Sequence, residues 1–171
     1  MIIEDEKNIC KSLNKTRKNL NCVILNISKK KIDYSISFLD YIRLGKIDCS
    51  HNKIESIDNV LSETVFDLNC SYNKIKLLDN LPPQIRVLDC SHNQIVKLDL
   101  LPGGILKLDC SYNQLILLND LPNGIEFLFC QNNKIQSLNC LPHNIKYLYC
   151  YDNEKNIELL NLPSSIEKIL S

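Results

Sequence analysis

The amino-acid sequence predicts a repeat solenoid: a curved array with a parallel β-sheet on its concave face, an extended or 3₁₀ convex side and few helices. Three observations support this prediction. A cysteine recurs every 20 or 21 residues, a Leu or Ile lies two positions before it, and a Leu-Pro pair follows in most units. A fixed period of this length is the sequence signature of stacked repeat architectures. The recurring cysteines are Cys49, Cys70, Cys90, Cys110, Cys130 and Cys150.

Each unit is expected to begin with a half-buried strand. Leu108 and Cys110 are two residues apart, so on a strand they share the inner face, while Lys107, Asp109 and Ser111 share the outer one. The stacked strands of successive units then form the parallel sheet. Because one unit buries too little apolar surface to fold alone, stability is expected to arise from contacts between neighbouring units.

An asparagine follows each strand, at the point where the chain has to turn away. Its side-chain amide can bond backbone groups of its own turn and of the neighbouring turn, which a buried turn would otherwise leave unpaired. The column consists of Asn52, Asn73, Asn93, Asn113, Asn133 and Asn153. The rest of each unit is too short for a helix with two connections, and its proline removes a backbone donor, so an extended return segment is predicted.

The period divides the chain into two parts. Residues 44–171 contain six units and a terminal seventh strand that Ile166 and Ile169 begin. Residues 1–43 break the period and are expected to form an N-terminal cap, with a short amphipathic helix within residues 3–18 and strand-like segments at 20–28 and 31–44. The last strand leaves either an open edge or an edge that a partner covers.

The repeat unit, I-x-x-L-x-C-x-x-N-x-I-x-x-L-x-x-L-P-x-x, resembles the leucine-rich repeat L-x-x-L-x-L-x-x-N-x-L, with cysteine at the third leucine position. Its length and its Leu-Pro pair look like the short class found in bacterial type-III effectors. The Cys-Ser-x-Asn pattern and the abundance of Ile, Lys and Asn are similar to repeat proteins that large DNA viruses of amoebae encode. The resemblance covers residues 44–171 and implies protein–protein interaction in a host–pathogen setting.

Composition and charge exclude several classes of partner. The 171 residues carry 20 basic and 20 acidic side chains, whereas a dedicated nucleic-acid binder normally has a basic excess. No apolar run approaches the roughly 18 residues of a membrane helix, and the N-terminus does not read as a secretory signal. We therefore expect a cytoplasmic protein, in the host cytoplasm if it is viral or an effector, with no nucleic-acid or membrane partner.

The cysteines are expected to be packed, reduced thiols. Strands about 4.8 Å apart would in principle permit a disulfide ladder or a thiolate metal site. The odd count of nine and the lack of a recognisable signal instead favour free thiols in a reducing compartment, and no short zinc-ligand spacing is present. Cys10 and Cys140 lie outside the ladder, and Cys140 is expected to be the more reactive thiol.

No catalytic, cofactor-binding or metal-binding residue is predicted. A cysteine hydrolase needs Cys and His within hydrogen-bond reach, but the ladder cysteines point inward while His51 and His92 occupy the turn. No phosphate-binding loop or nucleophile elbow is present. The ligase domain that some effectors of this repeat class carry is not matched by any segment here, so we predict a protein that is not an enzyme and has no cofactor.

The concave face is the predicted site of binding to a protein partner. Acidic residues line the first units and aromatic residues gather in the last two, and a cluster of exposed aromatics is the usual centre of an interface. The predicted contact residues are Tyr72, Asp89, His92, Asp109, Tyr112, Phe127, Phe129, Tyr147, Tyr149 and Tyr151. The acidic strip favours a basic partner segment over a weak cation site or an anionic ligand. The alternative is a homo-oligomer formed through the open C-terminal edge.

Overall fold

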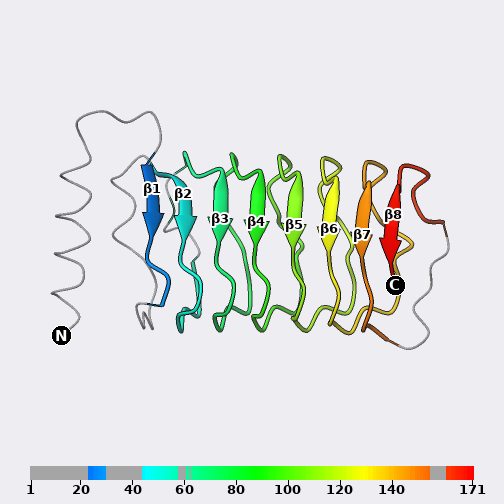
Figure 1. The fold of residues 1–171 in the computed structure, drawn as a ribbon, viewed down its shortest axis with the longest axis horizontal. Helices are drawn as coiled ribbons and strands as arrows, with labels where there is room; N and C mark the ends of the chain where they lie inside the picture. The colour runs from blue at the N-terminus through cyan, green and yellow to red at the C-terminus, as the bar shows by residue number, and fades with distance from the viewer. Residues whose placement is uncertain (1–22, 30–43, 58–60, 62, 155–160) are drawn as a thin grey trace, which may run out of the picture.

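A computed structural model describes residues 23–29, 44–57, 61, 63–154 and 161–171 of the chain (Figure 1). These residues form one parallel sheet whose eight strands follow each other in chain order. The strands are β1 (Val23–Asn26), β2 (Leu44–Asp48), β3 (Asp67–Asn69), β4 (Val87–Asp89), β5 (Lys107–Asp109), β6 (Phe127–Phe129), β7 (Tyr147–Tyr149) and β8 (Lys168–Leu170). The described residues contain no helix, and the predicted solenoid is confirmed.

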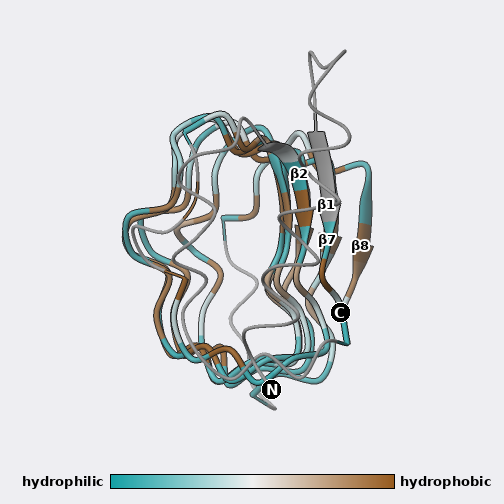
Figure 2. Ribbon diagram, turned by 90° about the vertical axis from the view of Figure 1, so that its left-hand side faces the viewer, coloured by the Kyte–Doolittle hydropathy of each residue, from teal (hydrophilic) through white to brown (hydrophobic). Residues whose placement is uncertain are grey.

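Successive strands pair in a register that matches the sequence period. Leu68 of β3 lies opposite Leu88 of β4, which in turn lies opposite Leu108 of β5. The repeat therefore places identical residue types on top of each other, and each unit buries its apolar face against its neighbours. In the end view the coils superimpose, with the sheet on one side and the return segments on the other (Figure 2).

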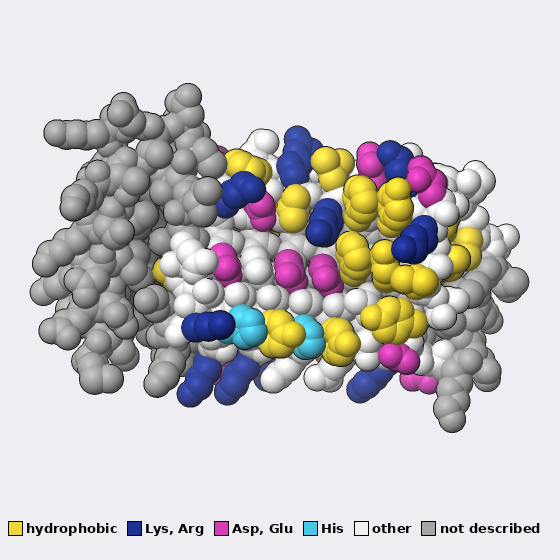
Figure 3. All heavy atoms as spheres, viewed as in Figure 1, with side chains coloured by type: hydrophobic (Ala, Val, Ile, Leu, Met, Phe, Trp, Pro, Cys, Tyr) yellow, Lys and Arg dark blue, Asp and Glu magenta, His cyan; other side chains and the backbone are white. Residues whose placement is uncertain are grey.

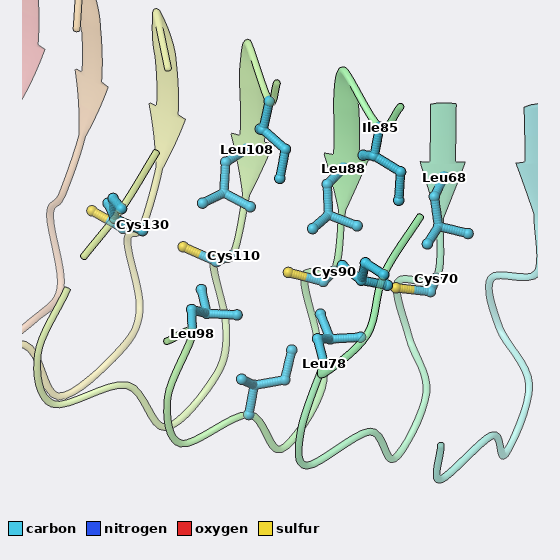
Figure 4. Close-up of a cluster of buried hydrophobic side chains, with 14 of the residues drawn as sticks. Leu68, Cys70, Leu78, Ile85, Leu88, Cys90, Leu98, Leu108, Cys110 and Cys130 are labelled. Carbon is cyan, nitrogen blue, oxygen red and sulfur yellow. The ribbon is translucent and has the colours of Figure 1, made fainter. Parts of the chain in front are cut away.

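The core is a continuous stack of aliphatic side chains and thiols inside the coil. Leu88 and Leu108 from the strands, Ile85 and Ile105 from just before them, and Leu98 from the return segment are all buried. Figure 4 shows these strand leucines and the ladder cysteines pointing into the same interior. No helix of the described residues is long and apolar enough to cross a membrane.

The return half of each unit is extended and contains isolated turns. In five units the backbone N–H of an isoleucine donates to the carbonyl of a proline three residues earlier, at 3.2–3.4 Å. These pairs are Ile85 with Pro82, Ile105 with Pro102, Ile125 with Pro122, Ile145 with Pro142 and Ile166 with Pro163. The predicted 3₁₀ element is thus a single turn in the described units, because the adjoining residues pack in extended conformation against the next coil.

The sheet extends beyond the six predicted units at both ends. β1 lies within the strand-like segment 20–28 and pairs with β2, with a register shift between Val23 and Ile24. β8 pairs with β7 and begins at Lys168, because Ile166 takes part in a turn with Pro163. The helix predicted within residues 3–18 and most of segment 31–44 lie outside the described residues.

Candidate functional site

The ladder cysteines are interior packing residues. All six are at most 1 % exposed, and three of them donate from Sγ to a carbonyl of the next unit at 3.3–3.4 Å. Burial raises the pKa of the Cys49 thiol to about 12 and that of Cys150 to about 11. The pKa values of the four thiols between them also lie well above the ordinary range, again mainly through burial. Neutral buried thiols serve neither as nucleophiles nor as metal ligands.

The chemistry available to a ligand therefore lies outside the ladder. All seven cysteines that the structure describes are free, and of these only Cys140 is exposed. Within the described ranges no three His, Cys, Asp or Glu side chains converge in a way that could hold a metal ion.

The asparagine column joins neighbouring units through the backbone. Asn113 Nδ2 donates to the carbonyls of Cys90, Cys110 and Ser111 at 3.0–3.1 Å. Its Oδ1 accepts the backbone N–H of Ile95 in the preceding unit at 2.9 Å. One buried amide thus satisfies groups from two units. Asn73, Asn93, Asn133 and Asn153 accept and donate in the same way, and Asn52 repeats the donations.

The residue before each ladder asparagine lies in the left-handed backbone region. These residues are His51, Tyr72, His92, Tyr112, Asn132 and Asp152, with φ between 52° and 56°. A left-handed backbone is uncommon for residues other than glycine, and nothing in the repeat unit predicts it at these positions. A recurring backbone bond accompanies the conformation in the first five units: the N–H of Tyr72 donates to the carbonyl of Ser91 in the next unit, as that of His92 does to Ser111.

The shared backbone conformation stacks four rings along one rim of the sheet. The centroids of His51, Tyr72, His92 and Tyr112 follow each other at 4.2, 3.9 and 4.0 Å, with interplanar angles of 11–12°. Figure 3 shows this row, in which histidine alternates with apolar-coloured rings. Burial lowers the pKa of His92, although the Asp109 and Asp89 carboxylates act in the opposite direction.

A row of acidic side chains crosses the middle of the sheet face. Each accepts hydrogen bonds from the serine two residues later, so Asp89 Oδ1 accepts from Ser91 N at 3.1 Å and from Ser91 Oγ at 2.7 Å. Asp109 and Ser111 repeat the arrangement at 3.0 and 2.6 Å. The serines of this column are buried, so Ser111, which was expected on the outer face with Lys107 and Asp109, does not expose its hydroxyl there.

The aspartate side chains of this face differ in whether a positively charged or hydrogen-bonding partner from a neighbouring strand offsets their negative charge. Asp67 forms an ion pair with Lys46 at 2.9 Å, and Asp48 Oδ2 accepts from Asn26 Nδ2 at 3.1 Å. Asp89 and Asp109 form no ion pair with any residue that the structure describes. Burial raises the pKa of Asp109, helped by the charge of Asp89, against the hydrogen bonds from Ser111 that lower it.

The substitution Asp109→Asn is expected to stabilise the protein at neutral pH. A raised pKa means that the fold favours the protonated carboxyl, so stabilisation present below pH 3.8 is lost as the pH rises through the folded-state pKa. An amide retains the oxygen that Ser111 bonds, as Asn69 shows with Ser71 at 3.0 and 2.7 Å. Urea denaturation should therefore give a higher free energy of unfolding for the variant at neutral pH, and the gain should shrink as the pH is lowered.

The reverse change, Asn69→Asp, is the matched control and should destabilise the protein at neutral pH. A variant Asp109→Asn that is less stable than the parent at neutral pH would show that the carboxylate contributes to folding.

An apolar groove lies beside the acidic row, over β4 to β7 (Figure 3). Its volume is about 580 Å³. Two pairs of stacked rings form much of its wall: Phe127 lies 5.0 Å from Tyr147 and Phe129 lies 4.7 Å from Tyr149, centroid to centroid. The full lining consists of Val87, Leu106, Lys107, Phe127, Phe129, Tyr147 and Tyr149.

Polar groups border this aromatic groove. The Lys107 ammonium lies 5.5 Å from the centroid of Phe129, and the Lys168 ammonium lies 5.8 Å from that of Tyr149. Tyr147 donates its hydroxyl to Glu167 Oε2 at 3.1 Å. An apolar centre with a charged border is the composition expected of a recognition surface.

The structure separates the predicted contact residues into three groups. Four aromatics line the groove, and Asp89 and Asp109 lie in the acidic row. Tyr72, His92 and Tyr112 belong to the ring stack, where His92 and Tyr112 also border a polar hollow of about 570 Å³ with Asn132 and Asp152. Tyr151 is 37 % exposed and lies outside the groove lining.

Three groove residues were missing from the predicted set: Val87, Leu106 and Lys107. Leu106 is 44 % exposed. The other units have mostly polar residues at this position, and this difference in the sequence could have identified Leu106 as a contact residue.

Fold and columns together define a solenoid of the leucine-rich-repeat type. The chain is similar to the leucine-rich-repeat domain of a Shigella effector, with 23 % identity and a TM-score of 0.71, covering 86 % of this chain and 66 % of that one. It is also similar to the functional domain of InlJ from Listeria monocytogenes, which includes a cysteine ladder, with 29 % identity and a TM-score of 0.66 over 76 % of this chain and 30 % of that one.

A third similar structure is YopM from Yersinia enterocolitica, with 29 % identity and a TM-score of 0.54, covering 74 % of this chain and 32 % of that one. The chain thus spans about two thirds of the Shigella domain and about a third of the other two. No protein-family model matches the sequence, and no curated protein matches it.

Proposed function

We propose that this protein is a non-enzymatic interaction scaffold that binds a protein partner through the exposed face of its sheet. The observation that carries the proposal is the aromatic groove, in which Phe127, Phe129, Tyr147 and Tyr149 stay accessible on a face where the other strand positions are mostly polar. Clustered aromatics with a polar border supply most of the binding energy at protein interfaces. Stacked repeats also offer an extended surface for such a partner.

The mechanism is rigid presentation. Each aromatic side chain stands on a strand paired on both sides, and its ring is stacked on that of its neighbour. Little conformational freedom is then lost when a partner binds, which lowers the entropic cost of association.

The substitutions Phe129→Asp and Tyr149→Asp should each abolish capture of the partner from cells in which the protein naturally acts. Removing an interface aromatic of this kind costs about 2 kcal/mol or more, roughly 30-fold in affinity. Far-ultraviolet circular dichroism should stay unchanged, because both side chains lie on the outer face of the sheet.

The matched control is Val96→Asp, which places the same charge on an apolar residue that is 48 % exposed and lies outside the strands. It should retain the partner. Capture that survives both aromatic changes would remove the groove as the binding site.

A second candidate function is self-association through β8. Its residues are exposed, including Ile169 at 37 % and Leu170 at 41 %, and no described strand pairs with its outer edge. Light scattering across a range of protein concentrations distinguishes the two functions, since a scaffold that binds other proteins stays monomeric while edge pairing gives a mass that rises with concentration.

We also propose that recognition takes place in a reducing compartment such as the cytoplasm, because the seven described cysteines are free thiols. The similarity to repeat proteins of amoebal viruses stays a prediction from the repeat pattern.

A further inference from the structure

We propose that the groove takes a partner segment in which an apolar side chain is followed by basic side chains. The apolar side chain occupies the aromatic groove, and the basic ones lie over Asp89 and Asp109. This inference rests on the proposed function, since it names the chemistry of the partner that the same face binds.

The fold does not need the negative charge of the acidic row. Asn69 occupies the same column, and its Oδ1 accepts the same two hydrogen bonds from Ser71 that Asp89 accepts from Ser91. The turn after each strand therefore requires a side-chain oxygen and no charge. The charges of Asp89 and Asp109 are therefore not required for the hydrogen bonds of the turn.

The two carboxylates lower the stability of the unbound protein. Asp89 and Asp109 lie opposite each other on adjacent strands, at a spacing of about 4.8 Å. Neither forms an ion pair within the described residues, and like charges directly opposite on a sheet are destabilising. Hydrogen bonds from Ser91 and Ser111 and the charge of Lys107 offset part of this cost, and a cation from a partner offsets more of it.

The acidic row and the aromatic groove are continuous. The groove lies beside the row over β4 and β5, and Asp109 of β5 lies opposite Phe129 of β6, which is part of the groove wall. An extended segment that crosses the strands can place one side chain in the groove and a later one over the carboxylates. Lys107, two residues before Asp109 on β5, also borders the groove, and its positive charge acts on Asp109.

Gln131 lies at the same boundary. It replaces the serine that the earlier units have at this position. Its side chain is 9 % exposed, and its Oε1 has no hydrogen-bond partner among the described residues. The backbone carbonyl of Gln131 bonds Tyr112, directly after the serine that holds Asp109. The Nδ2 of the adjacent Asn132 is likewise buried without a hydrogen-bond partner among the described residues, so this region holds one unpaired acceptor and one unpaired donor that a polar partner segment can bond.

The test is selection of random peptides, displayed on phage, against the full-length protein. Peptides retained by the parent protein should combine an aromatic or branched aliphatic residue with Arg or Lys nearby. A representative peptide is then synthesised with its basic residues intact, replaced by Gln or replaced by Glu, and its affinity is measured by fluorescence anisotropy.

The double variant Asp89→Asn, Asp109→Asn should weaken binding of the basic peptide by roughly 10- to 100-fold, the range for loss of a charged hydrogen bond. It should leave the Gln peptide unaffected and remove most of the salt dependence. Its fold is expected to persist because Asn69 already fills this column. The control Asp99→Asn removes a charge 50 % exposed outside the sheet and should change neither affinity.

The other outcomes of these measurements overturn either this inference or the proposed function. Selected peptides that are apolar without a basic bias, or that are acidic and pair with Lys107 and Lys168, overturn the inference while the groove remains a binding site. Equal affinity of the parent and the double variant for the basic peptide overturns it as well. Peptides that bind Phe129→Asp as tightly as the parent would instead overturn the proposed function.

Discussion

Replacing Asn113 by Ala is expected to lower the free energy of unfolding by about 2–5 kcal/mol, because buried groups left without a partner cost about 1–3 kcal/mol each. Asn113 is 9 % exposed and bonds three carbonyls and one N–H from two units. The Ile95 N–H loses its acceptor, and the carbonyls of Cys90 and Cys110 lose a donor. For a domain whose total stability is typically 5–15 kcal/mol, this is a large fraction.

Urea denaturation followed by circular dichroism measures this loss. The matched control is Asn144→Ala: Asn144 is exposed, and its Nδ2 donates to the carbonyl of Asn123 at 2.8 Å. That variant should lose no more than about 1 kcal/mol. Similar losses in the two variants would show that water replaces the ladder amide, which its burial argues against.

The second large effect is expected from Leu108→Ala, at about 2–5 kcal/mol, the range for removing a buried leucine side chain. Leu108 is 0 % exposed and lies between Leu88 and Leu128 in the central column of the core. The cavity would open in the middle of the array, where both neighbouring units depend on the contact.

Leu106→Ala provides the matched control, because the same change is made two residues away on a side chain that is 44 % exposed. Its effect on stability should stay within about 0.5 kcal/mol, as for ordinary surface substitutions. Leu106 lines the groove, so its removal should weaken partner binding while Leu108→Ala, where folded, should not. Equal destabilisation by the two changes would contradict the assignment of inner and outer faces.

The scaffold columns were predictable because their chemistry is local and repeated. Leu108 and Cys110 alternate with polar neighbours, which places them on one face of any strand. Asn113 follows at the turn, where an amide is the side chain that pairs backbone donors and acceptors at once. Repetition turns these weak local signals into a strong one, since each column is sampled in every unit.

The candidate site was predictable only in part. The aromatic residues of the last two units were visible as a cluster in the columns of the sequence, and four of them line the groove. The burial of Ser91 and Ser111 was not visible, because a serine in a strand reads as outward until its hydroxyl is seen bonded to the preceding carboxylate. No local pattern predicted that His92 and Tyr112 adopt a left-handed backbone or that their rings stack.

The period, the strands, the buried columns and the asparagine ladder can be read from the amino-acid sequence, because the same local pattern recurs in every unit. How positions from different units combine follows from the folded array. Whether Asp109 meets Phe129, and whether Leu106 joins the groove, depends on the register between strands twenty residues apart in the chain. Contacts across units are set by the stacking of whole coils, and no single unit contains that information.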